Sequence, residues 1–109
     1  MILRRWSGRI RTIDQEKYLE YVLETGAGDY QRTPGNLGFQ ILFRDLEDAS
    51  TEVTTLSWWE SMEAIRAFAG SEPELARYYP EDDQFLLDRP EHVEHHTVAA
   101  GRVHIAVGA

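Results

Sequence analysis

Two adjacent tryptophans, Trp58 and Trp59, end a segment whose composition is typical of a β-strand. The segment TEVTTLSWW is rich in threonine and valine, which strands favour. Because the side chains of a strand alternate between two faces, the two indoles point to opposite sides of the sheet. A chain of 109 residues builds one modest core, so one indole enters it and the other needs separate cover. The fold is therefore restricted to a sheet that is covered on both faces.

Other segments also show strand patterns. Residues 2–11 alternate between apolar and basic side chains, which indicates a strand with one buried face. Residues 36–47 carry a strongly apolar face and a mixed one, and a short turn links them to residues 51–59 as a β-hairpin. Residues 92–101 alternate again and are the predicted fourth strand. Residues 102–107 could form a short fifth strand, in this sheet or in that of a partner subunit.

A first helix is predicted over residues 12–26. Thr12 and Gln15 have the spacing of a capping box, in which the two side chains accept from free backbone amides. Gly26 follows as the residue that tolerates the left-handed end of a helix. The apolar stripe of this helix contains Tyr18, Leu19, Tyr21 and Val22. The glycine, proline and asparagine residues that follow predict a connecting loop up to Asn36.

A second helix is predicted over residues 62–69, with Ser61 as its N-cap and Gly70 just past its end. Its buried stripe contains Ile65, Phe68 and Ala69. Three prolines interrupt residues 71–91, which predicts short helical turns and loop. The acidic run at 80–83 lacks the ligand spacing of a calcium loop and is interpreted as the start of one such turn.

The order of the predicted elements is strand, helix, strand, strand, helix, strand. This order predicts one α+β domain over residues 1–109, with a ferredoxin-like antiparallel sheet and both helices on one face. The opposite face of the sheet is then bare, and the same face of a second subunit is the simplest cover for its indole. We therefore expect a homodimer that forms through the sheet faces.

The composition excludes several classes of function. Nineteen acidic and eleven basic residues give a formal charge of -8, which repels nucleic acids and anionic membranes. No run approaches the roughly 18 apolar residues of a membrane span, so we expect a cytoplasmic protein that binds no membrane. The chain has no cysteine, and it contains neither a phosphate-binding glycine loop nor a His-Glu-x-x-His motif. Flavin, nicotinamide and zinc are therefore not implied, and we expect no cofactor and no metal.

Four stretches of the sequence together resemble a known family. They are SWWESMEAIRAFAG, ELARYYPEDDQFLL, HVEHHTV and TPGNLGFQILFR. They resemble the antibiotic biosynthesis monooxygenase-like family of dimeric α/β-barrel proteins, and the resemblance covers nearly the whole chain. It implies a dimeric α/β barrel. It also implies one of two activities, which are the cofactor-free oxygenation of electron-rich polycyclic phenols and the degradation of haem.

The haem-degrading relatives use an asparagine, a tryptophan and an axial histidine. By the resemblance, these positions fall at or near Trp6, at Phe68 and at Tyr78 of this chain. All three residue types differ, so haem degradation by that mechanism is disfavoured. Tyrosine can ligate haem iron, which keeps haem binding open as a third hypothesis.

A cofactor-free oxygenase needs an apolar pocket, a hydrogen-bond donor for a phenolate and a base. We expect the pocket between the sheet and the helices, with Trp59 and Phe68 in its walls. Tyr78 and one of the histidines His95 and His96 would transfer protons. As neighbours on a strand, the two histidines face opposite ways. The alternative for each of these residues is a purely structural role in packing or hydrogen bonding.

Arg44 and Asn36 are the candidates for orienting a substrate. Arg44 lies on the mixed face of its strand, where the alternative is an ion pair with a carboxylate. Asn36 lies in the sequence PGN, which is also a turn signal.

Two functional hypotheses follow from these residues and from the resemblance. The first is a cofactor-independent monooxygenase that acts on a small aromatic or quinone-type substrate. The alternative is a non-catalytic or stress-associated dimeric protein that binds a small hydrophobic aromatic ligand in the same pocket.

Overall fold

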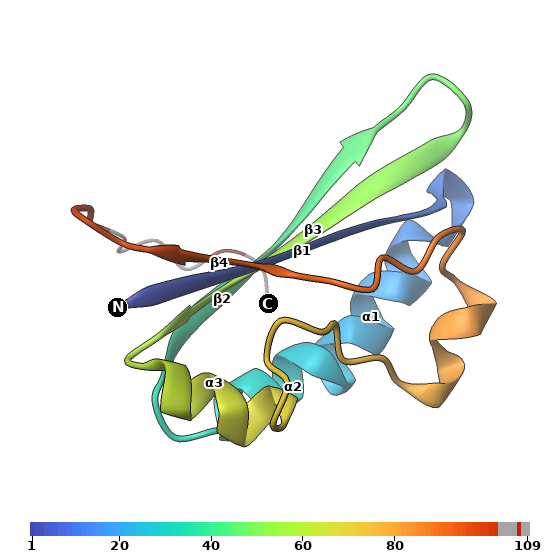
Figure 1. The fold of residues 1–109 in the computed structure, drawn as a ribbon. Helices are drawn as coiled ribbons and strands as arrows, with labels where there is room; N and C mark the ends of the chain where they lie inside the picture. The colour runs from blue at the N-terminus through green and yellow to red at the C-terminus, as the bar shows by residue number, and fades with distance from the viewer. Residues whose placement is uncertain (103–106, 108–109) are drawn as a thin grey trace.

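Four strands form one antiparallel sheet in the computed structural model of the protein, which describes residues 1–102 and 107 (Figure 1). The strands are β1 (Ile2–Arg11), β2 (Asn36–Asp45), β3 (Ser50–Trp59) and β4 (Glu94–Thr97). The helices are α1 (Gln15–Glu24), α2 (Gly26–Arg32) and α3 (Met62–Ala69), with short 3-10 helices η1 (Thr12–Asp14) and η2 (Pro80–Gln84). The three α-helices lie on the same side of the sheet (Figure 1).

The strand order, β2-β3-β1-β4, confirms the predicted ferredoxin-like α+β fold. α1 and α2 connect β1 to β2, and α3 begins the connection from β3 to β4. The predicted first strand and the β2-β3 hairpin are confirmed, whereas the fourth strand is shorter than predicted. Apart from its two end residues, the segment 102–107 lies outside the described residues, so its fifth strand stays a prediction.

The predicted capping box at the start of the first helix is wrong. The hydroxyl of Thr12 lies 3.0 Å from that of Thr51, and the side-chain amide of Gln15 donates to the same Thr51 hydroxyl at 2.7 Å. Both side chains thus bind β3 rather than the first turn, because a buried threonine of the neighbouring strand offers them a partner. The turn η1 intervenes, and α1 begins at Gln15.

The predicted loop after Gly26 is also wrong in its first half. Gly26 is the first residue of α2 and does not adopt a left-handed conformation. The break between α1 and α2 lies at Thr25, with φ -99° and ψ -94°. α2 buries Ala27 and Tyr30 against the rest of the core. A seven-residue helix with two glycines is stabilised by this tertiary packing rather than by intrinsic propensity, and the sequence pattern therefore does not reveal it.

The two adjacent tryptophans occupy opposite faces of the sheet. Trp59 is fully buried on the helix-covered face, where its indole N–H donates to the Ser57 hydroxyl at 2.8 Å. Trp58 lies half-buried on the other face, directly opposite Leu3 of β1. The helices of this chain thus cover one indole and leave the other partly exposed.

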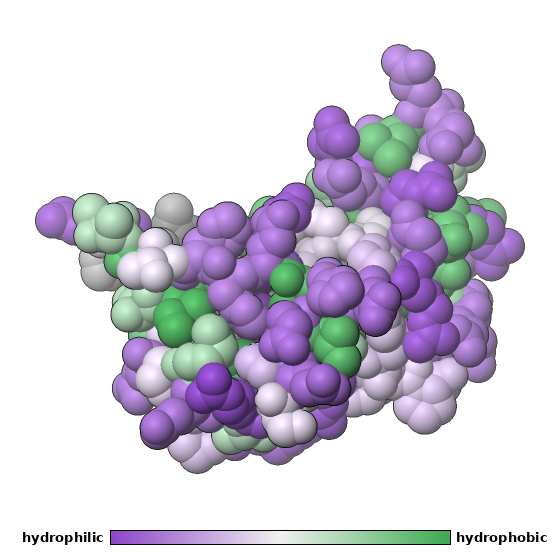
Figure 2. All heavy atoms as spheres, in the orientation of Figure 1, coloured by the Kyte–Doolittle hydropathy of each residue, from purple (hydrophilic) through white to green (hydrophobic). Residues whose placement is uncertain are grey.

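The view in Figure 2 shows hydrophilic side chains over most of this side of the molecule, with hydrophobic residues in small separate patches. Within the described part of the chain, no helix combines the length and the apolar character that crossing a lipid bilayer requires.

The start of α3 provides a first prediction. The Ser61 hydroxyl accepts a hydrogen bond from the backbone amide of Ala64 at 3.2 Å and thereby caps the helix. We expect Ser61→Ala to lower the free energy of unfolding by about 1 kcal/mol, because the amide loses this acceptor. Urea unfolding measures the change, and Ser71→Ala, in the exposed turn after α3, is the control. Equal stability of the two variants would contradict the capping role.

Candidate functional site

A cavity lies between the helix-facing side of the sheet and the segment that follows α3. The space open to the centre of a water molecule is about 60 Å³, enough for about four to six waters at roughly 10–15 Å³ each. A ligand confined to this space is therefore about the size of one aromatic ring. The aromatic side chains in the walls are those of Trp6, Tyr18, Tyr30, Phe68, Tyr78 and Tyr79.

Every layer of the fold contributes to these walls. Arg4 and Trp6 are two residues apart on β1, so both point to the helix-facing side. The rings of Tyr30 on α2 and Phe68 on α3 pack with their centroids 4.8 Å apart. Tyr78, from the segment after α3, stands edge-on to the indole of Trp6, with 6.3 Å between the ring centroids. The cavity is therefore defined only when sheet, helices and loop have all docked.

The Tyr78 hydroxyl is held at a fixed point in this cavity. It accepts a hydrogen bond from the indole N–H of Trp6 at 3.1 Å and donates to the carbonyl oxygen of Pro90 at 2.5 Å. Burial raises the pKa of Tyr78, an effect that the hydrogen bond from Trp6 opposes. The hydroxyl is therefore neutral near pH 7 and acts as a hydrogen-bonding group, with one acceptor lone pair left for a ligand.

Arg4 is a wall residue that the sequence analysis missed. Its side chain is only 4% exposed, and burial lowers its pKa from the ordinary value. Its guanidinium donates to the carbonyl oxygens of Pro73 and, at 3.1 Å, of Leu75. Its position in the alternating pattern of β1 could have revealed it, because Arg4 lies on the same strand face as Ile2 and Trp6.

The two predicted histidines lie on opposite faces, as expected for neighbours in a strand. Nε2 of His95 lies 3.1 Å from Nη1 of Arg4 on the helix-facing side, one layer behind the cavity wall. Burial, and then the charge of Arg4, lower the pKa of His95, so the neutral ring accepts this hydrogen bond. His96 is exposed on the other face, 3.3 Å from Glu94. Neither histidine lines the cavity.

Three further predicted site residues also lie outside the cavity wall. Asn36 donates to the backbone oxygen of Trp58 at 3.2 Å, at the start of β2. Arg44 is exposed on the opposite face of the sheet and forms a 3.4 Å ion pair with Glu52. Trp59 is buried behind Tyr30 and Phe68. Of the predicted site residues, the structure thus brings together Tyr78 and Phe68 in one wall.

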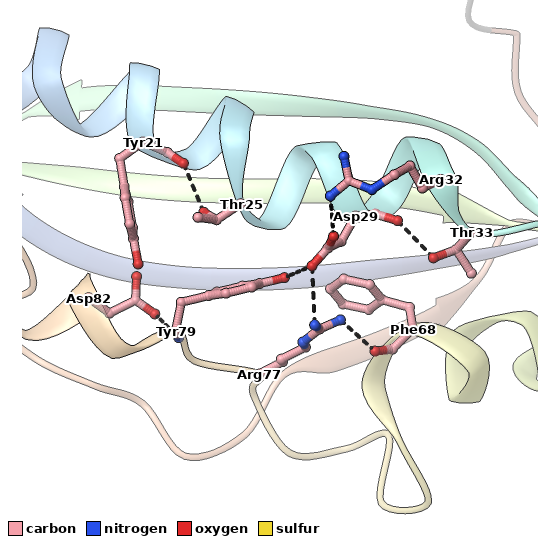
Figure 3. Close-up of polar contacts among 9 residues, drawn as sticks. All are labelled: Tyr21, Thr25, Asp29, Arg32, Thr33, Phe68, Arg77, Tyr79 and Asp82. Atoms are coloured by element: carbon pink, nitrogen blue, oxygen red, sulfur yellow. Dashed lines mark hydrogen bonds and ion pairs between the residues drawn. The ribbon is translucent and has the colours of Figure 1, made fainter.

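Asp82 provides a carboxylate in the wall. Its side chain is 6% exposed, and one oxygen accepts the backbone amide of Tyr79 at 2.6 Å. The hydroxyl of Tyr21 points toward the same carboxylate (Figure 3). Burial and this neighbouring carboxylate raise the pKa of Tyr21. The sequence analysis identified the acidic run around Asp82 as a helix start and gave it no role in a site.

Asp29 connects α2 to the rim of the cavity (Figure 3). Its carboxylate accepts the Tyr79 hydroxyl at 2.5 Å and pairs with Arg77 at 3.1 Å, as well as with Arg32. Arg77 in turn donates to the Phe68 backbone oxygen at 2.9 Å, at the end of α3. Burial alone would raise the pKa of Asp29. The hydrogen bonds from Tyr79 and Arg32 and the charge of Arg77 outweigh this effect, so the pKa lies below its ordinary value.

The lowered pKa of Asp29 makes its contribution to stability depend on pH. Above about pH 4, the ordinary carboxyl pKa, the contribution is fully present, and it is lost as the pH falls through the lower pKa of the folded state. We therefore expect Asp29→Asn to unfold more easily than the wild type at pH 7, and the difference to shrink below about pH 4. Urea unfolding across this pH range measures it, with Glu20→Gln on the exposed face of α1 as the control. A difference that stays constant down to pH 3 would contradict the proposed role of the carboxylate.

Comparison with known proteins identifies the family of the chain. The family model described as antibiotic biosynthesis monooxygenase matches residues 12–79, more than half of the sequence. Among proteins with curated functions, none matches.

Several solved structures share the fold. A Bacillus cereus protein assigned as an antibiotic biosynthesis monooxygenase is 19% identical, with a TM-score of 0.61 and coverage of 94% of this chain and 97% of its own. A haem-degrading protein of Mycobacterium tuberculosis, solved free of haem, is 21% identical, with a TM-score of 0.51 and coverage of 94% and 100%. A Streptomyces coelicolor monooxygenase in complex with nanaomycin D is 16% identical, with a TM-score of 0.55 and coverage of 96% and 92%. At these identities the likeness concerns the fold, and it agrees with the match to the family model. The chain belongs to the antibiotic biosynthesis monooxygenase family.

Proposed function

We propose that the protein is a cofactor-independent monooxygenase that acts on a small aromatic or quinone-type substrate. The observation that carries this proposal is the cavity itself, which is lined by six aromatic side chains, one of them Tyr78 with its fixed hydroxyl. Aromatic walls suit a flat, electron-rich ring, and the polar groups orient it. The Streptomyces coelicolor neighbour, a monooxygenase in complex with nanaomycin D, supports the same substrate class.

The chemistry needs a proton acceptor and a site that stabilises an oxyanion. A base removes a proton from an activated CH2 group of the substrate, and the resulting anion gives one electron to O2. The two radicals combine to a peroxide, and loss of water then leaves a carbonyl, so that CH2 and O2 become C=O and H2O. In this cavity Asp82 is the carboxylate that accepts the proton, and the Tyr78 hydroxyl orients the substrate by accepting a hydrogen bond from a substrate hydroxyl group through its free lone pair.

The role of Tyr78 can be tested by removing its hydroxyl. We expect Tyr78→Phe to lower turnover about 10²-fold or more, because the ring remains but the group that orients the substrate is lost. Oxygen uptake with a panel of small aromatic compounds that carry an activated CH2 group measures the effect. Thermal unfolding of the same variant serves as the control for folding. Unchanged turnover would remove Tyr78 from the mechanism.

The second candidate function is binding without catalysis. It is favoured by the hydrogen bonds of Tyr78, whose hydroxyl proton is already donated to Pro90, and by the position of His95 behind the wall. Ligand binding without any oxygen uptake in the same panel would favour this alternative. Haem binding is a third hypothesis, kept open by the haem-degrading neighbour and by Tyr78, a tyrosine in the cavity wall that could ligate iron. Absence of a Soret band after reconstitution with haem would rule out haem binding.

We also propose that the protein is a homodimer that forms through the helix-free face of the sheet. Leu3, Leu56 and Trp58 lie together on this face, because Leu3 pairs with Trp58 and Arg5 pairs with Leu56 in the β1-β3 register. All three apolar side chains are half-buried within one chain. A second copy of the same face would remove them from water.

Light scattering at micromolar concentration tests the dimer. We expect the wild type to have the mass of two chains and Trp58→Glu to have the mass of one, because the new charge would be buried in the interface. Leu23→Glu is the matched control, since Leu23 is 38% exposed on α1, on the helix-covered side of the sheet (Figure 1). A wild-type protein with the mass of one chain would overturn the proposed interface.

A further inference from the structure

Arg4 is a buried cation that has only neutral partners in the described part of the chain. Its guanidinium contacts the carbonyl oxygens of Pro73 and Leu75 and the Nε2 atom of His95. No carboxylate of residues 1–102 lies within ion-pair distance of it. The other arginines without such a carboxylate, Arg66 and Arg102, are exposed, so water solvates their charge.

Part of the hydrogen-bonding capacity of Arg4 is also unused. The three contacts employ three of the five guanidinium N–H groups. The remaining donors, on Nε and on Nη2, have no acceptor among the described residues. These two nitrogens lie on one edge of the planar group, the arrangement with which arginine binds two oxygens of an acid or one shared oxygen. Arg4 lines the cavity, so a ligand there can reach it.

A structural role alone does not account for the charge of this residue. A neutral amide donor would satisfy backbone carbonyls without the cost of removing a cation from water. Buried charges in proteins are normally paired with a group of opposite charge. The described part of the chain supplies no anion to pair with Arg4.

The other charged groups of the wall do not supply this anion. Arg77 is neutralised by Asp29 at 3.1 Å. The Asp82 carboxylate accepts the Tyr79 amide at 2.6 Å and makes no ion pair with Arg4. The Phe68 ring lies 5.8 Å from the guanidinium carbon of Arg4, so an aromatic ring held by Arg4 would lie beside another aromatic ring.

We propose that Arg4 binds an anionic oxygen carried by a single aromatic ring, so that the cavity selects the ionised form of a small phenol or aromatic acid. The inference deepens the proposed function, because it names the charge state of the substrate class. It rests on the cavity as a ligand site and does not require that the bound molecule react with oxygen.

The test uses 4-nitrophenol, whose phenolate absorbs visible light while its neutral form does not. The probe is titrated with the protein at a pH where both forms coexist in buffer. The wild type is expected to bind the phenolate at least about tenfold more tightly than the neutral phenol, which lowers the pKa of the bound probe by at least about one unit. The colour of the solution therefore deepens on binding.

Arg4→Met keeps an unbranched side chain about as long as the aliphatic part of arginine, and it removes the charged guanidinium group. We expect this variant to prefer the neutral phenol, because an apolar cavity without a cation disfavours the charged form. Arg66→Met, the same substitution at an exposed position of α3, is the matched control and should bind like the wild type. Persistence of the phenolate preference in Arg4→Met would overturn the proposal.

The wild type alone also decides the question if Arg4→Met fails to fold. A wild type that prefers neutral 4-nitrophenol, or that binds neither form, overturns the anion site without any variant. Failure of this inference and failure of the proposed function are distinguishable. If the protein binds the phenolate but consumes no oxygen with any tested substrate, the result supports the Arg4 anion site and contradicts the proposed monooxygenase activity.

Discussion

The contact among Trp59, Tyr30 and Phe68 holds the sheet and two helices together. Tyr30 of α2 and Phe68 of α3 both pack on the indole of Trp59, with ring centroids 5.9 and 5.7 Å from it, and on each other. These rings dock both helices on the same end of β3. The cavity exists because this packing leaves space on the side that faces β1, where Arg4 and Trp6 lie. A loss of the aromatic contact would therefore remove the site together with the fold of α2.

Charge is distributed unevenly between this cavity and the rest of the molecule. The chain as a whole carries a formal charge of -8, yet its buried Arg4 has only neutral partners among the described residues. A buried cation in a low-dielectric wall acts on a neighbouring ligand far more strongly than an exposed one. The attraction in the cavity favours a small anion that can shed its water. The repulsion at the negatively charged surface disfavours large polyanions.

Much of the fold could be predicted from the sequence because alternation and capping are local signals. β1, the hairpin and α3 follow from period-two patterns and from the serine before Met62. α2 could not be predicted, because Tyr30 stabilises it through partners on α3 and β3 that are distant in the sequence. The site was predicted only in part. Tyr78 and Phe68 reach the cavity, whereas Arg4 escaped notice because charged residues of strands usually face water.

Binding of an oxygen anion by Arg4 in the aromatic cavity can be seen in a crystal structure of the protein with 4-nitrophenolate. We expect the phenolate oxygen at about 2.7–2.9 Å from Nε or Nη2 of Arg4, with its ring between Trp6 and Phe68. A structure in which the phenolate lies elsewhere and the cavity holds only water would contradict it.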